Sequence, residues 1–324
     1  MTKIEDVKKE NISKVKQCFY DGEIWTKNKI AQSTGISKAG TTNILKALSY
    51  EHFIVYCGDA TSTGGRKSKQ YQLNRDYFHI GQIILMCKPD GYHLIARITD
   101  LFNCSTYEKD VALCQGNLAE LKAIADDLLA RDRLIDVLCL SVPGICEDGF
   151  LSVCDFKQLE GIDLKKELVW SRPIRVIVEN DVNIASIGLS HFYHQRHLAF
   201  LYQPAVEFVG CGLIIQGKLY NGFSHFAGEL RYLPFYDHDV QRQMLKNDPI
   251  ELLKLQVETV CCVINPSFVC ICSDVADVHE LKLSLPSRHC PQIAVVTDMD
   301  RYICEGLYYI VINNRIKGDE NDES

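Results

Sequence analysis

The amino-acid sequence predicts an α/β protein in which a winged helix-turn-helix domain precedes a body of two α/β lobes. Three observations support this fold class. Short capped helices and two β-prone segments fill the first 75 residues, apolar strands alternate with amphipathic helices after them, and this alternation occurs twice. The predicted ranges are 1–75 for the first domain, 76–195 and 196–317 for the lobes, and 318–324 for a disordered acidic tail.

Length and composition are typical of a soluble cytoplasmic protein. With 324 residues, 47% hydrophobic and 24% charged, the chain can bury an ordinary core. It shows no signal segment at its start and no run of the roughly 18 apolar residues that a membrane helix needs. Its 15 cysteines are scattered through apolar segments without zinc-site spacing, so most are expected in the core. We therefore expect no membrane, metal or cofactor.

The charge is divided unevenly along the chain. Residues 1–75 carry 13 Lys and Arg against 7 Asp and Glu, a net charge of +6, whereas the remaining 22 basic and 35 acidic residues give −13. This asymmetry indicates that the basic domain, and not the acidic body, meets a polyanion.

Three helices are predicted in the basic domain, over residues 10–20, 26–33 and 37–50. Thr26 and Ser37 are expected to cap the second and third helices, and Gly35 ends the second. This spacing is that of a helix-turn-helix. The third helix keeps its leucines inward, which leaves polar side chains that suit base edges and phosphates. The predicted DNA contacts on this helix are Ser37, Lys38, Thr41, Thr42, Asn43 and Lys46.

A two-stranded wing is predicted next, over 53–57 and 70–73, around a Gly-rich basic tip. Arg66, Lys67 and Lys69 at that tip are expected to contact the DNA backbone or minor groove. A small solvated helical domain, or a winged helix that binds another partner, would also fit these residues.

The body reads as alternating strands and helices. Strands are expected at 78–87 and 92–101 around a turn at 89–91, and at 134–144, 175–180, 197–204, 267–274 and 292–298. Helices are expected at 117–132, 164–169, 181–193 and 248–265, and a closing helix at 301–314 can pack back on the first lobe. A second hairpin has Gln216 and Gly217 in its turn.

The segment VENDVN at 178–183 places polar side chains after an apolar strand. The carboxyl ends of strands are where open α/β sheets bind ligands, so this position predicts a binding site. Asp181 could accept a proton there, or it could only hold a ligand or cap a helix.

Four segments together resemble the ROK family (repressors, uncharacterised frames and sugar kinases). They are STGISKAGTTNILKAL with GGRKS in the basic domain, VPG at 142–144, ENDVN at 179–183 and GLIIQGKLYNGFSHFAGEL at 212–230. The resemblance spans about residues 10–315 and is to the repressor branch. It implies two actin-like or hexokinase-like (ribonuclease H-like) lobes, a homodimer or tetramer, and control of operator DNA by a sugar or sugar phosphate.

The resemblance also implies roles for individual residues. Asp181 matches the kinase base, Asn180 and Glu229 match sugar contacts, and Tyr232 replaces a sugar-binding His. The predicted ligand-binding residues are therefore Asn180, Asp181, Glu229 and Tyr232, and no catalytic residue is expected.

The motifs of phosphoryl transfer are altered. Residues 84–88 stand where the kinases have a Gly-rich turn with a metal-assisting Asp, and Val206, Glu207 and Phe208 replace a second Gly-rich loop. The family's zinc cysteines are missing too, which leaves His238 as a lone loop residue.

We therefore predict a transcriptional regulator of carbohydrate-related genes, a repressor that binds a palindromic operator as a homodimer or tetramer. Two alternatives remain. One is a residual ATP-dependent sugar kinase with a DNA-binding head, and the other is an architectural DNA-binding protein whose body only dimerises.

Overall fold

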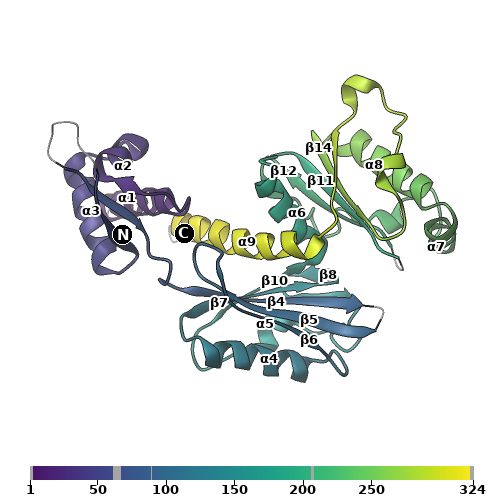
Figure 1. Cartoon of the computed structure of the whole chain (residues 1–324), viewed down its shortest axis with the longest axis horizontal. Helices are drawn as coiled ribbons and strands as arrows, with labels where there is room; N and C mark the ends of the chain where they lie inside the picture. Colours follow the sequence, from purple (N-terminus) through teal and green to yellow (C-terminus); the bar gives the residue numbers. More distant parts are fainter. Residues whose placement is uncertain (1–2, 61–66, 89, 206–207, 322–324) are drawn as a thin grey trace.

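The basic domain forms three helices beside a small antiparallel sheet (Figure 1). The computed structural model describes residues 3–60, 67–88, 90–205 and 208–321, with side chains described over 7–315. The elements of this domain are α1 (Lys3–Phe19), β1 (Trp25–Thr26), α2 (Lys27–Thr34), α3 (Lys38–Tyr50), β2 (Ile54–Asp59) and β3 (Lys69–Leu73). Strand β3 lies between β1 and β2. This arrangement confirms the winged helix-turn-helix part of the predicted fold class.

The caps of the helix pair are those predicted. The hydroxyl of Thr26 accepts a hydrogen bond from the Lys29 amide at 3.3 Å, and that of Ser37 accepts one from the Gly40 amide at 3.1 Å. Gly35 ends α2 with a φ of 71°, which glycine adopts without steric cost. The turn between α2 and α3 is therefore fixed by local chemistry.

The first lobe is built on a five-stranded sheet in the order β10-β7-β4-β5-β6. Its strands are β4 (His79–Lys88), β5 (Gly91–Thr99), β6 (Ser105–Ala112), β7 (Ile135–Val142) and β10 (Arg175–Asn180). Strands β4, β7 and β10 are parallel. Helix α4 (Leu118–Arg131) covers one face, and smaller elements follow in β8 (Gly144–Glu147), β9 (Phe150–Cys154) and α5 (Leu164–Glu167). Pro89 of the predicted turn lies outside the described residues.

The second lobe has its own five-stranded sheet, in the order β13-β12-β11-β14-β15. Its strands are β11 (Leu198–Gln203), β12 (Gly210–Ile215), β13 (Lys218–Leu219), β14 (Phe268–Ser273) and β15 (Gln292–Val295). Helix α6 (Asp181–Phe192) packs against β11 and β12, and α7 (His238–Asn247) and α8 (Pro249–Ile264) complete the lobe. Gln216 and Gly217 form the predicted two-residue turn, with φ angles of 55° and 77°.

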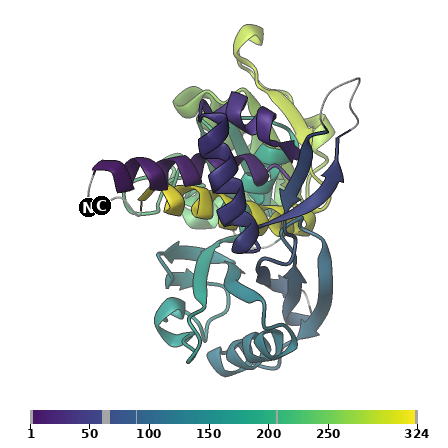
Figure 2. The same cartoon turned by 90° about the vertical axis from the view of Figure 1, so that its left-hand side faces the viewer.

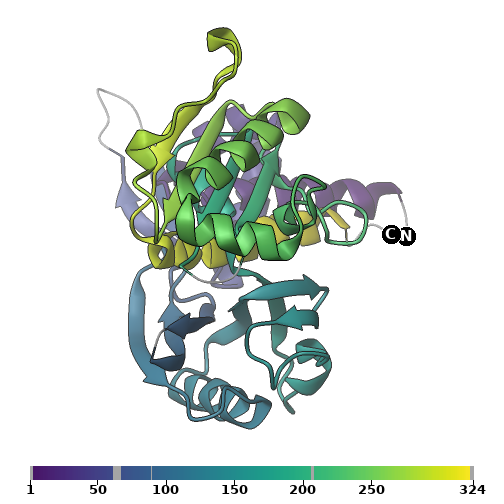
Figure 3. The same cartoon turned by 90° about the vertical axis from the view of Figure 1, so that its right-hand side faces the viewer.

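Helix α9 (Met299–Asn321) runs between the two sheets (Figure 1). It packs against α6, against β4 and β7 of the first lobe, and against α1 of the basic domain. The start of α1 and the end of α9 lie side by side (Figures 2 and 3). Helix α9 thus contacts all three parts of the molecule.

The elements that were not anticipated from the sequence include β1, β6, β8, β9 and α7. Strand β6 is an edge strand and has no buried residue, so it lacks the apolar alternation that marks a strand. Helix α7 buries only Gln241 and Leu245. The prediction that His238 is a loop residue is wrong, because His238 opens α7 and Asp237 caps that helix.

The carboxyl end of the chain differs from the prediction as well. Helix α9 continues to Asn321, beyond the expected end at 314 and into the segment expected to be a disordered tail. Seven of the 15 cysteines are buried, two are partly buried and six are exposed, so a core role fits only about half of them. In the described part of the chain, no helix has the length and apolar character to cross a bilayer.

Candidate functional site

The amino-terminal half of α3 presents polar side chains on the surface of the basic domain. Lys38, Thr42 and Lys46 follow one another at four-residue intervals, so they lie on one helix face. In the described part of the chain, neither lysine is ion-paired. The predicted DNA contacts that are exposed or partly exposed are Ser37, Lys38, Thr42, Asn43 and Lys46.

Thr41 does not belong to this surface. It is fully buried, and its hydroxyl donates to the Ser37 carbonyl at 3.0 Å. Thr41 precedes Leu45 and Leu48 at helical spacing, and all three face the domain core. The prediction that Thr41 contacts DNA is therefore wrong, since its polar side chain is used inside the helix.

The wing places further cations beside this helix. Strands β2 and β3 pair from Ile54 and Leu73 out to Asp59 and Lys69. Lys67 and Lys69 are exposed, and the Lys69 ammonium lies 5.7 Å from the Tyr56 ring centroid. Arg66 lies outside the described residues. Helix and wing together form a basic surface of the kind that meets phosphates.

The first half of the candidate ligand site lies at the start of α6. Asn180 caps this helix, because its side-chain oxygen accepts from the Asn183 amide at 3.0 Å. Its amide nitrogen donates to the Gly144 carbonyl at 2.8 Å and to Asp181 Oδ1 at 3.0 Å. Asp181 is the first residue of the helix and not its cap, so the alternative reading of Asp181 as the cap is wrong. The structure brings Asn180 and Asp181 together and ties both to the VPG segment.

Asp181 has an unusual carboxyl group. Burial raises its pKa to about 7, and the nearby charge of Asp155 adds to this effect. Hydrogen bonds from the Val182 amide, at 2.8 Å, and from Asn180 act in the opposite direction. Near neutral pH the group therefore exchanges between an acceptor and a donor of hydrogen bonds, and either form can bind a hydroxyl.

Glu179 organises the site and is absent from the predicted ligand set. Its Oε1 accepts from the Asn180 amide at 2.9 Å and from Asn183 Nδ2 at 3.1 Å. Its Oε2 accepts from Asn221 Nδ2 at 3.4 Å, and that nitrogen lies 3.2 Å from His225 Nδ1. This carboxylate joins the end of β10 to the segment after β13. In the sequence, Glu179 could have been identified as a site residue because it follows an apolar run in a predicted strand. Asn221 could have been identified only by its place in the motif at 212–230.

The second half of the site surrounds Glu229. Burial raises the pKa of Glu229, and Arg231 opposes this, with its Nε 3.3 Å from Glu229 Oε2. Tyr232 is 51% exposed, and its ring centroid lies 5.0 Å from that of Phe226 and 5.5 Å from that of His238. Glu229 is thus flanked by an aromatic surface formed by Phe226, Tyr232 and His238.

The two halves of the site are joined only indirectly. Among the described residues, no hydrogen bond links Asn180 or Asp181 to Glu229 or Tyr232. The connection runs through the Glu179 carboxylate and through α6, which packs closely on β12 at Gly210 and Gly212. A side chain at either glycine would overlap α6.

Where they are described, the segments matched to the kinase phosphate loops form a regular strand and an aromatic packing contact. Residues 84–88 lie within β4 and pair regularly with β5, and Ile84 and Leu85 are buried. Phe208 has the Arg242 guanidinium 4.9 Å from its ring centroid, and Val206 and Glu207 lie outside the described residues. Within the described ranges, no cluster of three His, Cys, Asp or Glu could hold a metal ion.

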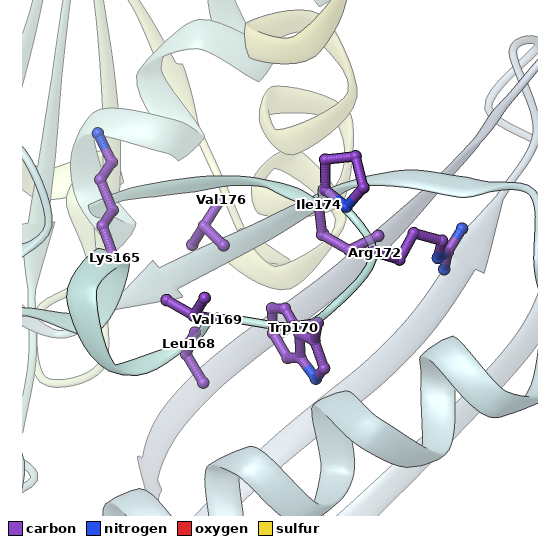
Figure 4. A pocket seen from close by; sticks show the side chains of 8 residues that line it. Lys165, Leu168, Val169, Trp170, Arg172, Ile174 and Val176 are labelled. Carbon is purple, nitrogen blue, oxygen red and sulfur yellow. The ribbon is translucent and has the colours of Figure 1, made fainter.

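Two cavities lie away from these residues. One of about 290 Å³ lies beside β10, where Trp170, Ile174 and Val176 line it (Figure 4). The other, of about 410 Å³, lies in the basic domain between α1 and α2, next to Trp25. Neither includes a predicted ligand residue.

Comparison with known proteins finds sequence similarity over about two thirds of the chain. The chain is 25% identical over 229 residues to the xylose repressor of Caldicellulosiruptor bescii, which covers 67% of this chain and 56% of the relative. It is 26% identical over 230 residues to the xylose repressor of Staphylococcus xylosus, covering 68% and 59%. The chain thus matches less than two thirds of the length of these relatives. No family model matches the sequence.

The fold gives a broader match. A solved ROK family transcriptional regulator, described as a homologue of the E. coli MLC protein, covers 95% of this chain and is itself covered fully, with a TM-score of 0.66 and 12% identity. A ROK family glucokinase from Streptomyces griseus, solved with glucose and AMPPNP, covers 72% of this chain and 98% of its own, with a TM-score of 0.54 and 11% identity. The chain is thus similar in sequence to proteins named xylose repressors, and it shares the fold of solved ROK family proteins.

Proposed function

We propose that the chain is a sequence-specific DNA-binding transcriptional regulator, a repressor that responds to a sugar and has no sugar kinase activity. The observation that carries this proposal is the basic winged helix-turn-helix domain joined to a ROK-type body. Similarity to proteins named xylose repressors supports repression and a sugar effector. A cytoplasmic location follows from the proposed role.

In the proposed complex, α3 enters the major groove and the wing contacts the phosphate backbone. Lys38, Asn43 and Lys46 are accessible for this, and Lys67 and Lys69 extend the basic surface onto the hairpin. One helix reads only a few base pairs. A homodimer or tetramer that places two such helices one helical turn apart on a palindromic operator would supply the remaining specificity.

The proposed effector is a neutral sugar. Asp181 and Glu179 lie at one half of the site, Asp155 is close enough to raise the pKa of Asp181, and Glu229 lies at the other half. Arg231 is already paired with Glu229. A phosphate group would meet repulsion from these carboxylates, whereas sugar hydroxyls would find acceptors. The aromatic surface at Tyr232 offers an apolar face to the sugar ring.

The main alternative is a residual ATP-dependent sugar kinase. One observation favours it, since a carboxyl group with a pKa of about 7 suits a general base. Against it, residues 84–88 form a regular strand, so no Gly-rich loop approaches a phosphate there. A phosphorylation assay with ATP and a sugar panel separates the two functions. Turnover that disappears in Asp181→Ala would overturn the proposal.

The proposed DNA-binding role is tested by genome-wide capture of DNA bound to the full chain. We expect a small set of palindromic sites near genes of carbohydrate uptake or metabolism. Uniform coverage without a shared sequence would instead support an architectural protein whose body only dimerises.

A further inference from the structure

The turn between β5 and β6, residues 100–104, connects parts of the molecule that are distant in the sequence. Asp100 is only 2% exposed, and its Oδ1 accepts from the amides of Phe102 at 2.8 Å and Cys104 at 3.0 Å. Its Oδ2 accepts from Arg75 Nε at 2.9 Å and lies 2.7 Å from the second guanidinium nitrogen. A buried carboxylate with four donors fixes both the turn and Arg75.

On one side this turn contacts the basic domain. Arg75 follows β3, at the end of the wing, and its carbonyl accepts from the Leu101 amide at 3.1 Å. The Phe102 ring packs against Gly22, in the loop after α1, where a Cβ atom would lie 3.3 Å from the ring. The Arg75 guanidinium lies 5.7 Å from the centroid of the same ring. The turn thus contacts the basic domain at two places, the loop after α1 and the segment after β3.

On the other side the turn contacts α9. The hydroxyl of Tyr308, which is buried, donates to the Leu101 carbonyl at 2.9 Å. Asn103, whose φ is 57°, donates from Nδ2 to Glu305 Oε2 at 3.0 Å. These two hydrogen bonds join the turn to one face of α9.

Helix α9 is in turn fixed to α6, which starts at the candidate ligand site. A side chain at Gly188 of α6 would overlap the Tyr302 carbonyl of α9, and one at Gly306 of α9 would overlap the Ile184 carbonyl of α6. The two backbones therefore touch, and contacts this close leave little freedom for one helix to move without the other.

We propose that the 100–104 turn is the joint through which the state of the ligand site sets the position of the basic domain. This inference rests on the proposed function. A sugar at Asn180 and Asp181 displaces α6 and α9 as one unit, and the turn passes the displacement to Arg75 and Gly22. The sugar alters DNA affinity because the two positions of the basic domain fit the operator unequally.

The test uses full-length variants that cut the joint on the α9 side and leave the ligand site intact. Asn103→Gly removes the side-chain amide and tolerates the positive φ, Glu305→Ala removes its partner, and Tyr308→Phe removes one hydroxyl. Tyr309→Phe is the matched control, because the Tyr309 hydroxyl makes no hydrogen bond within the described residues. DNA affinity is measured with and without D-xylose, on a duplex selected by the wild-type protein from a random library. Xylose binding is measured separately by calorimetry.

We expect xylose to weaken DNA binding of the wild-type protein by about tenfold. In the combined Asn103→Gly and Tyr308→Phe variant, xylose should weaken DNA binding by less than about twofold. Asn103→Gly and Glu305→Ala should give the same loss singly and together, because they remove one hydrogen bond. Xylose affinity without DNA should be unchanged, and Tyr309→Phe should behave as wild type.

An undiminished xylose effect in the combined variant would overturn the joint alone and would favour transmission through the direct contact of α1 with α9. Lost xylose binding in the same variants would overturn it too, because the turn would then support the site itself. A wild-type protein that binds the duplex equally with and without xylose would overturn the joint and the proposed sugar response together.

Discussion

Replacing both Lys38 and Lys46 by alanine should make DNA binding less dependent on salt. Both side chains are exposed, lie on one face of α3 and are not ion-paired in the described part of the chain. Each phosphate that a lysine neutralises contributes about 0.9 to the slope of log affinity against log salt. The double variant should therefore lose about 1.8 from the slope per protomer, or about 3.6 for a homodimer. Between 50 and 200 mM salt the affinity of a homodimer should then fall about 150-fold less than that of wild type, or about 12-fold less for each protomer.

The assay is a salt titration of the full chain on its selected duplex, followed by fluorescence anisotropy. Alanine favours helix, so α3 should remain folded, and the melting temperature checks this. Lys246→Ala on α7 is the control for a lysine outside the proposed surface, because it is also exposed. An unchanged slope in the double variant, or an equal change in Lys246→Ala, would refute the placement of α3 against the phosphates.

Three further predictions concern stability and specificity. Thr41→Val should leave DNA affinity unchanged and lower the free energy of unfolding by about 1 kcal/mol. Asn43→Ala, in contrast, should cost about 1–3 kcal/mol of binding free energy at the selected sequence. Titrations on selected and scrambled duplexes distinguish the DNA affinities of the two variants. Because burial raises the pKa of Asp181 above its unfolded value, the folded state holds this proton more tightly and stability should fall as pH rises from about 4 to 7. Asp181→Asn should remove at most about 4 kcal/mol of that fall, and an unchanged pH profile of the melting temperature would contradict the shift. Gly306→Ala should destabilise the protein by about 1–3 kcal/mol or more, since the new methyl group overlaps the Ile184 carbonyl, and calorimetry that finds no loss would contradict the close helix contact.

The elements that could be predicted from the sequence are those whose signals are local. Thr26 and Ser37 cap their helices through hydrogen bonds three residues away, and Gln216 with Gly217 makes the turn that positive φ angles require. The buried strands could be predicted as well, because each is marked by a continuous apolar run in the sequence. The fold class followed from the order of these elements.

What could not be predicted depends on tertiary contacts. Thr41 looks like a surface residue in the sequence, and only packing of the helix face shows that its hydroxyl is turned back to the Ser37 carbonyl. Glu179 meets Asn221 across 42 positions of the chain, and Asp100 meets Arg75 across 25. The hydrophobic periodicity of a sequence indicates local structure and does not show which distant residues will pair. The ligand site was therefore only partly predicted, and the joint to the basic domain was not predicted at all.

The central claim is that a sugar changes the DNA affinity of this chain. The most direct measurement is the dissociation constant for the selected duplex, at fixed salt, with and without saturating D-xylose, with D-xylose 5-phosphate in a parallel titration. We predict that xylose weakens DNA binding by about tenfold and that the phosphate has much less effect, because carboxylates line the proposed site. Equal affinity under all three conditions would contradict the account.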